Sequence, residues 1–369
     1  MSIDPQKGAL PLQRIRELLR ASAIENAREE HLQPSSIDLS LSDEAHRMRG
    51  TFLPQKGESM RDIVKRGTLF PASLAQPLEL CGIYLVRLNE KMRLPPGVYG
   101  CANNKSSSGR VNLQTRLLGD GVSQFDKIPP GYTGELWLEI IPKSFPVKLE
   151  AGERLNQIRL FTGDTRLSMD EHRADHAAEG FLYGADGERI GGPSLIGNDG
   201  IAMTIDLSSQ DVIGYKCSPT TCRVLDFSAR NLDPLEFFEP IPRPRDGQIF
   251  MRRDEFYIFV TKEWLRVPIP YAVEMIPYDP SYGEFRSHYA GFFDPGWGYG
   301  PDGSMKGTPA VLEVFTHDND FILRDGQPIC KVVYERLTEP PEIAYGDPRM
   351  GSHYLGQKGP RLGKQFRME

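Results

Sequence analysis

The stretch YLVRLNEKMRLP at residues 84–95 recurs without a gap as YIFVTKEWLRVP at residues 257–268. Tyr84 aligns with Tyr257, an offset of 173 residues (257 − 84). Both stretches are rich in aromatic and branched apolar residues and end at a proline, which is typical of β-strands. The chain therefore contains two copies of one β-rich unit.

Further matches keep the same order along the chain. They are Glu139 with Glu313 and Gly152 with Gly326, both at an offset of 174, and SIDLS (36–40) with TIDLS (204–208) at an offset of 168. We expect the copies to cover roughly residues 30–165 and 200–338. The predicted parts are a first domain with an N-terminal helix (1–165), a linker (166–199), a second domain (200–338) and a flexible C-terminal tail (339–369).

Short apolar runs between prolines and glycines predict a mostly β fold. The runs are GIYLVRL (82–88), GELWLEII (134–141), EFYIFVT (255–261) and AVLEVFT (310–316). Runs of this length predict strands of a sandwich, roll or barrel. One helix is expected near the start, where Leu12, Ile15 and Leu18 share one face.

Composition narrows the function classes. The formal net charge of -6 argues against a broad electrostatic surface for nucleic acid. No signal peptide and no run of about 18 apolar residues is present, so we expect a cytoplasmic protein with no membrane contact. The sequence lacks the His-x-Glu and Pro-Cys-x-x-Cys elements of zinc deaminases, so no protein-bound zinc is expected.

The two copies differ at one polar cluster. The first copy carries KSSSGR at residues 105–110, and the 173-residue offset places YDPSYG (278–283) opposite it. Hydroxyls, backbone N–H groups and an arginine fork suit a phosphate chain, although a solvated surface turn is an equal alternative on these residues alone. Conversely, Asp294 of the second copy aligns with Pro129 of the first.

Glu139 interrupts the apolar strand LWLEII. If buried there, its carboxyl pKa rises and suits proton transfer near neutral pH. The alternative is an outward-facing strand glutamate, which the alternation of strand side chains permits.

Five motifs in this order resemble those of the dCTP deaminases and the related trimeric dUTPases. They are QPSSIDLSL (33–41), YLVRLNEKMRLP (84–95), KSSSGR (105–110), PPGYTGELWLEI (129–140) and GERLNQIRLF (152–161). The chain is most similar to the long, tandem dCTP deaminases of bacteria. The resemblance implies two distorted β-barrel or jelly-roll domains, a homo-oligomer with threefold contacts between β domains, and sites formed where subunits meet.

The resemblance also implies roles for individual residues. Glu139 matches the family's general base, and Ser106 and Arg110 match residues that line the same site. The remaining expected substrate-binding residues are Lys105, Ser107, Ser108, Asp126, Gln157, Tyr354, Gln357 and Lys358. Tyr354, Gln357 and Lys358 belong to HYLGQKGPR (353–361), which is similar to a tail that folds over bound nucleotide.

The first copy departs from the family pattern because the expected aspartate is missing before Gly131. We expect Asp126 to take the place of this missing aspartate. The second copy keeps Asp294 and Glu313 but lacks the serine–arginine loop, so these two residues rank below Glu139. A composite site that joins the loop of one copy to Asp294 or Glu313 of another stays open.

The implied reaction is the deamination of dCTP to dUTP and ammonia, without a metal at the base. Mg²⁺ is expected on the substrate triphosphate and dTTP as an effector, with no metal ligand supplied by the protein. The alternatives are dUTP hydrolysis, alone or coupled to deamination, a catalytically inactive nucleotide-binding regulator, and a purely structural β protein.

Overall fold

The computed structural model describes residues 7–191, 196–197, 200–218, 223–277, 285–287, 291–316, 319–350, 354 and 356–367. It divides into two compact units. Unit 1 comprises Met1–Thr165, Thr221–Leu232 and Gln365–Glu369, and unit 2 comprises Arg166–Thr220 and Asp233–Lys364. The YDPSYG segment (278–283) lies outside the described residues.

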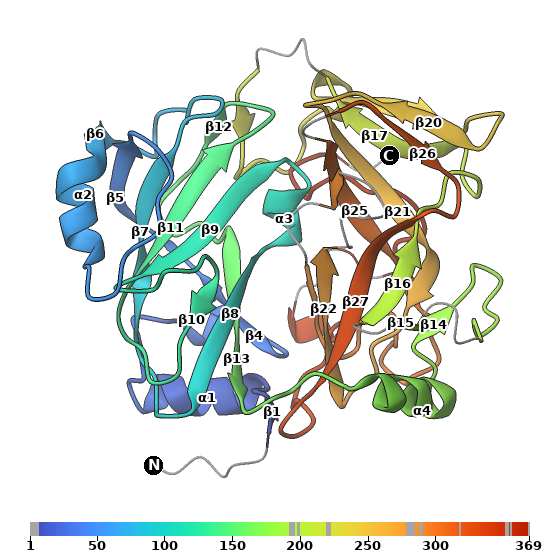
Figure 1. The fold of residues 1–369 in the computed structure, drawn as a ribbon, viewed down its shortest axis with the longest axis horizontal. Coiled ribbons are helices and arrows are strands. Elements are labelled where there is room, and N and C mark those ends of the chain that lie inside the picture. The colour runs from blue at the N-terminus through green and yellow to red at the C-terminus, as the bar shows by residue number, and fades with distance from the viewer. Residues whose placement is uncertain are drawn as a thin grey trace. The chain divides into compact units, whose positions relative to one another are not determined.

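Unit 1 is built on two antiparallel sheets (Figure 1). The first has the order β10 (Lys127–Ile128), β8 (Val98–Asn104), β13 (Asn156–Thr162), β4 (Ser36–Leu39) and β3 (Leu32–Gln33), with β1 (Gly8–Ala9) on β13. The second has the order β6 (Thr68–Ala72), β5 (Leu41–Met48), β7 (Tyr84–Arg93), β11 (Thr133–Pro142) and β9 (Leu113–Gly119), with β2 (Ile24–Glu25) on β7. Unit 1 also contains β12 (Val147–Lys148) with β18 (Leu225–Asp226), α1 (Leu12–Arg20), α2 (Met60–Gly67), α3 (Ser106–Gly109) and a 3₁₀ turn, η1 (Glu29–His31).

Unit 2 repeats this plan. One sheet has the order β19 (Phe238–Pro242), β17 (Val212–Cys217), β21 (Phe256–Leu265), β25 (Thr308–Thr316) and β23 (Phe285–Ser287), with β14 (Leu182–Tyr183) on β21. The other has the order β15 (Ile196–Gly197), β16 (Gly200–Thr204), β27 (Pro328–Arg336), β22 (Tyr271–Pro277) and β24 (Phe292–Phe293). A ribbon of β20 (Gln248–Met251) and β26 (Phe321–Arg324), helix α4 (Met169–Glu179), η2 (Pro234–Glu236) and η4 (Pro348–Met350) complete the unit.

The mostly β fold in tandem copies is confirmed, and the two copies agree residue by residue in strand register. In unit 1, Glu139 on β11 lies opposite Leu85 on β7. In unit 2, Glu313 on β25 lies opposite Ile258 on β21, which keeps the offsets of 174 (313 − 139) and 173 (258 − 85). A similarity found in the sequence of these strands is therefore also a similarity of pairing.

The match between SIDLS and TIDLS is wrong by four residues. Leu39 of β4 pairs with Asn156, whereas Met203 of β16 pairs with Cys330. Because Asn156 and Cys330 keep the 174-residue offset (330 − 156), residues 36–40 correspond to residues 200–204. Asp206 in the second motif instead accepts hydrogen bonds from the backbone N–H groups of the two serines that follow. The four-letter identity is thus local turn chemistry and not equivalent structure.

Both units begin with a helix, and only the first was expected. Leu12, Ile15 and Leu18 of α1 are buried, as the periodicity predicts. The segment 166–199, expected as a linker, contains α4 and β14 and belongs to unit 2. The signal for α4 is a capping box, in which Ser168 and Glu171 satisfy each other's backbone N–H groups.

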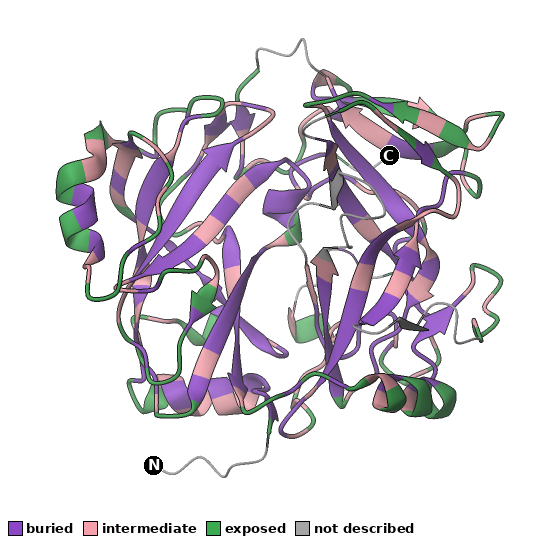
Figure 2. Ribbon diagram, viewed as in Figure 1, coloured by how far each residue is buried: buried purple, intermediate pink, exposed green. Residues whose placement is uncertain are grey.

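Helix α2 builds a small second core on the outer face of the β5–β7–β11–β9 sheet. Its buried residues Met60, Ile63 and Val64 pack with Met48, Leu85, Leu118 and Trp137. Figure 2 shows the result, since β11 is buried along most of its length while the outer side of α2 is exposed. Within the described ranges, no helix has the length and apolarity needed to cross a membrane.

Candidate active site

Glu139 is buried within β11, with an exposed fraction of 2%. Its neighbours Leu138 and Ile140 are completely buried, so both faces of the strand are covered at this point. Glu139 shares its face with Trp137, two residues earlier, because side chains alternate along a strand. This is the face covered by α2 and by the loop that precedes it.

Within the described residues, one hydrogen bond holds the Glu139 carboxylate. Thr51, in the loop after β5, donates its Oγ1 hydroxyl to Oε1 of Glu139 at 3.0 Å. The other oxygen, Oε2, is buried and has no hydrogen-bond partner within the described part of the chain. A buried carboxylate oxygen without a donor is costly, so this atom is a candidate for contact with a ligand or a reacting water.

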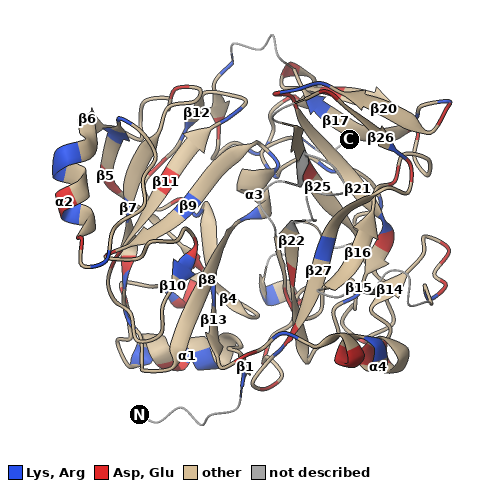
Figure 3. Cartoon of the chain, viewed as in Figure 1, with Lys and Arg blue, Asp and Glu red and all other residues tan. Residues whose placement is uncertain are grey.

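Arg116 and Asp126 form an ion pair beside Glu139. Arg116 lies on β9, directly opposite Glu139 in the strand register. Its Nη1 donates to Oδ2 of Asp126 at 2.7 Å, and the backbone N–H of Leu117 donates to Oδ1 of Asp126 at 2.8 Å. Asp126 therefore holds Arg116 at the strand position opposite Glu139. Figure 3 shows the corresponding acidic and basic positions on the adjacent strands β11 and β9.

The surroundings raise the pKa of Glu139 above its ordinary value. Desolvation by burial is the largest cause, and the negative charge of Asp126 acts in the same direction. The Thr51 hydrogen bond and the positive charges of Arg116 and Lys143 oppose this increase. A carboxyl with a raised pKa can accept and return a proton closer to neutral pH.

The KSSSGR motif forms α3, a single turn between β8 and β9. Ser106 is exposed, whereas Ser107, Ser108 and Arg110 are buried. Ser108 donates its hydroxyl to the Leu155 carbonyl at 2.9 Å, while the buried Ser107 hydroxyl has no partner among the described residues. The motif is therefore an ordered turn that presents one serine to solvent.

The lysine of this motif is held by a buried aspartate. Lys105 Nζ pairs with Oδ1 of Asp38, and Arg154 lies 3.6 Å from Oδ2 of the same carboxylate. Asp38 is on β4 opposite Gln157, and Gln157 donates weakly to the Asn104 carbonyl at 3.5 Å. Two cations thus surround Asp38, and Gln157 lies in the strand beside them.

A buried polar network connects the KSSSGR turn with the part of β9 that lies opposite Glu139. Thr115 donates its hydroxyl to Oδ1 of Asn104, and Asn156 donates to Thr115 Oγ1 at 3.1 Å. Asn104 directly precedes the KSSSGR motif, and Thr115 directly precedes Arg116. Among the described residues, Glu139 makes no hydrogen bond or ion pair with residues 105–110. Both groups belong to unit 1.

The three residues expected in the tail lie in unit 2. Tyr354 is part of the hydrophobic core of unit 2. Gln357 is buried and donates to the Pro309 carbonyl at 2.9 Å. The Lys358 carbonyl accepts from Gln210 at 3.3 Å. Their closure over a nucleotide stays a prediction.

Unit 2 contains the two second-copy residues. Glu313 is buried on β25 at the position that corresponds to Glu139. Asp294 is also buried, and its carbonyl accepts from Trp297 N at 3.0 Å, as the Pro129 carbonyl accepts from Tyr132 N at 3.2 Å. The turn geometry thus supports the alignment of Asp294 with Pro129.

Sequence reasoning missed Thr51, Arg116 and Asp38 as members of this site. Thr51 lies in a loop without a motif, so only the folded chain places it against Glu139. Arg116 is a charged residue within the apolar run LQTRLLG, which is the same signal that identified Glu139. Asp38 belongs to the repeat match SIDLS and to the motif QPSSIDLSL, but neither assigns it a role in a site.

Comparison with known proteins gives a consistent result. Residues 6–164 match the family model of the 2'-deoxycytidine 5'-triphosphate deaminase N-terminal domain, and residues 168–366 match that of the C-terminal domain. A crystal structure of 2'-deoxycytidine 5'-triphosphate deaminase from Agrobacterium tumefaciens is 38% identical, with a TM-score of 0.83, over 91% of this chain and 100% of that one.

Two curated relatives carry the name "dCTP deaminase, dUMP-forming". The protein from Methanobrevibacter smithii is 28% identical over 131 residues, or 35% of this chain and 63% of the relative. The protein from Aquifex aeolicus is 27% identical over 173 residues, or 45% of this chain and 91% of the relative. The match therefore covers slightly less than two thirds of the first of these proteins.

Proposed function

The chain belongs to the dCTP deaminase family, and on that premise we propose that it deaminates dCTP to dUTP and ammonia. The observation that carries the proposal is the environment of Glu139. Its carboxylate is buried, one oxygen is held by Thr51, and the other has no partner among the described residues.

Glu139 acts first as a base and then as an acid. It removes a proton from a water molecule, whose oxygen forms a bond to C4 of the cytosine ring. The glutamate returns this proton to the ring nitrogen N3. It then transfers the proton of the new C4 hydroxyl to the amino group as the C4–N bond breaks and the C4 carbonyl forms. Water is consumed and ammonia released, so the ring becomes uracil. Burial supports this role because it raises the pKa of Glu139.

Ser106 and Arg110 bind the substrate and stabilise the charge that develops during attack. Lys105, Ser107 and Ser108 lie beside them on the same turn and complete the phosphate-binding loop. Since Glu139 makes no hydrogen bond or ion pair with residues 105–110 among the described residues of one chain, we propose that the site combines the loop of one subunit with Glu139 of a neighbour in a threefold homo-oligomer. Asp126 contributes through Arg116, which it holds beside Glu139.

Mg²⁺ enters on the substrate triphosphate. Across the described ranges, no group of three or more His, Cys, Asp and Glu side chains is placed to hold a metal ion. In this proposal the ligands of Mg²⁺ are phosphate oxygens and water, which suit this ion. Gln157 lies near the pyrimidine in this proposal, and Tyr354, Gln357 and Lys358 close over the nucleotide. We further propose dTTP as an effector and the cytoplasm as the location.

A second product is the specific alternative. The curated relatives are named dUMP-forming, which favours subsequent hydrolysis of dUTP to dUMP and pyrophosphate. The pure protein should be incubated with dCTP and Mg²⁺ while ammonia, dUTP, dUMP and pyrophosphate are measured. Ammonia with dUTP supports deamination alone, and equal amounts of ammonia, dUMP and pyrophosphate support the coupled reaction. No ammonia from a folded protein refutes the proposal.

A further inference from the structure

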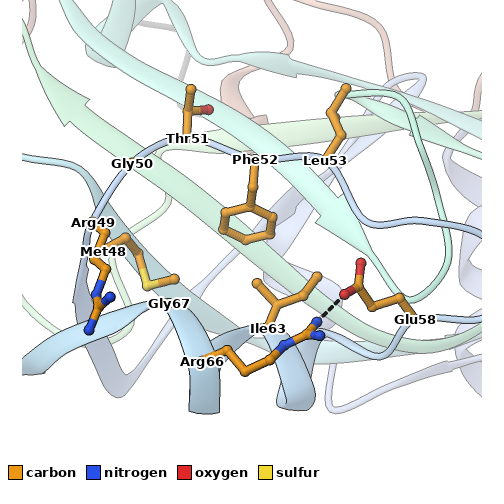
Figure 4. Close-up of a pocket in the computed structure, with 10 residues that line it drawn as sticks. All are labelled: Met48, Arg49, Gly50, Thr51, Phe52, Leu53, Glu58, Ile63, Arg66 and Gly67. Atoms are coloured by element: carbon orange, nitrogen blue, oxygen red, sulfur yellow. Dashed lines mark hydrogen bonds and ion pairs between the residues drawn. The ribbon is translucent and has the colours of Figure 1, made fainter.

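The loop between β5 and α2 carries Thr51, which contacts Glu139, and the same loop packs against α2 on its opposite side. Phe52 points toward Ile63 of α2, whereas Thr51 points the other way (Figure 4). Both residues line a cavity of about 300 Å³ that extends to Glu58 and Arg66, which form an ion pair. Phe52 also packs with the small core that contains Trp137. Thr51 is exposed, and the residue that follows it, Phe52, is held by this packing.

Among the described residues, this cover, formed by the loop and α2, is present in the first copy and absent from the second. Strand β17 corresponds to β5, because Tyr215 lies opposite Ile258 as His46 lies opposite Leu85. In unit 1, β5 is followed by the loop and α2. In the second copy, Thr221–Leu232 follows β17 and belongs to unit 1, where β18 pairs with β12. No α-helix lies between β17 and β19 in the described residues. The copy that retains the KSSSGR motif thus also has the only cover of this kind in the described chain.

We propose that Thr51 is a positioning residue for Glu139, which rests on the proposed function of that glutamate. The terminal torsion of a glutamate is soft and roughly twofold, so an isolated carboxylate samples a broad range of orientations. The Thr51 hydroxyl has one proton to donate and uses it at Oε1. This contact fixes the carboxylate plane and leaves Oε2 as the oxygen that exchanges the proton with water.

Removal of the Thr51 hydroxyl has a defined effect on pH dependence. Charged groups that influence Glu139 are Arg116 on β9, Asp126 before β10 and Lys143 after β11. His46 on β5 and Glu139 on β11 both lie opposite Leu85 on the strand β7 between them. All of these groups remain in a Thr51 variant. The Thr51 hydrogen bond lowers the pKa of Glu139, so its loss moves the acid limb of the rate profile to higher pH.

The test compares dCTP deamination across pH for the wild type, Thr51→Val, Thr51→Ser and Glu139→Gln. Valine matches threonine in shape but has no donor, whereas serine keeps the hydroxyl. We expect Thr51→Val to lower kcat by about 10- to 100-fold, the range for hydrogen bonds to charged groups, with little change in KM. Its acid limb moves to higher pH, and Thr51→Ser retains most of the activity and the wild-type limb.

Gln55→Ala is the matched control, because Gln55 is exposed on the same loop. It should leave kcat and the pH profile unchanged, and thermal unfolding should be similar for all variants. A Thr51→Val protein with wild-type kcat and pH profile, beside an inactive Glu139→Gln protein, overturns the role of Thr51 alone. Equal losses in Thr51→Val and Gln55→Ala also overturn it. Full activity in Glu139→Gln overturns the proposed function of Glu139 itself.

Discussion

At the scale of single residues, the environment of Glu139 determines both its pKa and its effect on the stability of the folded state. Burial favours the neutral carboxyl, whereas Thr51 and Arg116 favour the charged one. The net result is a raised pKa, because desolvation is the largest cause. A residue placed in this way is useful for proton transfer and disfavours the folded state when ionised.

The glutamate should be essential for activity. Glu139→Gln keeps the shape of the side chain but removes the exchangeable proton. Because general acid–base catalysis contributes about 10²- to 10⁴-fold, we expect deamination to fall by at least the lower value. Ammonia release under saturating dCTP measures this change. Wild-type turnover in a protein freed of all other deaminase activity would remove Glu139 from the mechanism.

The same substitution should change how stability depends on pH. In the wild type, the stability contributed by neutral Glu139 is fully present below the ordinary pKa of 4.5 and is lost as pH rises through the raised folded-state pKa. Glutamine does not titrate. The melting temperature of Glu139→Gln relative to wild type should therefore increase from pH 4 toward neutral pH. A constant difference across this range, measured by thermal unfolding, contradicts the raised pKa.

At the scale of elements, the central strands β7 and β21 each contain a buried glutamate that accepts hydrogen bonds from a residue at the end of a neighbouring strand. Oε1 and Oε2 of Glu90 accept from the hydroxyl and N–H of Ser40 at 2.7 and 3.0 Å. Glu263 accepts from the hydroxyl and N–H of Thr204 at 2.6 and 2.7 Å. Glu90 and Glu263, the duplicated glutamates of residues 84–95 and 257–268, are therefore structural.

These two glutamates should matter for stability. Glu90→Ala or Glu263→Ala leaves a buried N–H and a hydroxyl without their acceptor, and each unmet group costs about 1–3 kcal/mol. Denaturant unfolding should show a loss of at least this size for each variant. Glu153→Ala, a change at a half-buried turn residue of unit 1, is the comparison and should cost less. A loss below 0.5 kcal/mol, the ordinary range for surface changes, would contradict the assigned role.

The C-terminal segment supports the serine turn in unit 1. Gln365 is completely buried and donates to the Ser107 carbonyl at 3.2 Å, while its backbone bonds to Leu232. Gln365→Ala should loosen this turn and raise KM for dCTP more than it lowers kcat, because in the proposed mechanism the turn binds the substrate and does not transfer protons. Steady-state kinetics beside Gln365→Glu, which lacks the donor but keeps the size, separates the lost hydrogen bond from lost packing. Unchanged KM in both variants contradicts the support.

At the scale of the whole molecule, the copies have the same strands and different additions. The first copy carries KSSSGR and the loop with α2, and the second carries Asp294, whereas a buried glutamate at the same strand position, Glu139 or Glu313, is common to both. This asymmetry supports one type of site per chain, built on the first copy. It also leaves the second copy free to contribute structure or regulation.

A composite site should show complementation between inactive variants. Glu139→Gln and Arg110→Ala each lack one half of the site. If subunits share sites, mixing the two proteins under conditions that exchange subunits should restore a measurable fraction of activity, since some sites then combine an intact loop with an intact glutamate. Ammonia release before and after mixing measures this. Persistent inactivity, although subunit exchange is demonstrated by mass, indicates a site made within one chain.

The sequence by itself determined the tandem β architecture and the order of the motifs, and it identified Glu139 as a candidate because a carboxylate interrupts an apolar strand there. Strand periodicity and motif identity are local properties, and they persist in any fold that buries the same runs. The register of β4 and β16 could not be predicted, because SIDLS and TIDLS differ in pairing and not in composition.

Only the tertiary structure decided which residues surround the carboxylate. Thr51, Arg116 and Asp126 come from a loop, a strand and a turn, and their proximity depends on strand pairing and on the packing of α2. Burial is likewise a property of the assembled sheets, so the pKa of Glu139 follows from the fold. A sequence identifies the acid, but desolvation and neighbouring charge, which need three dimensions, determine its protonation.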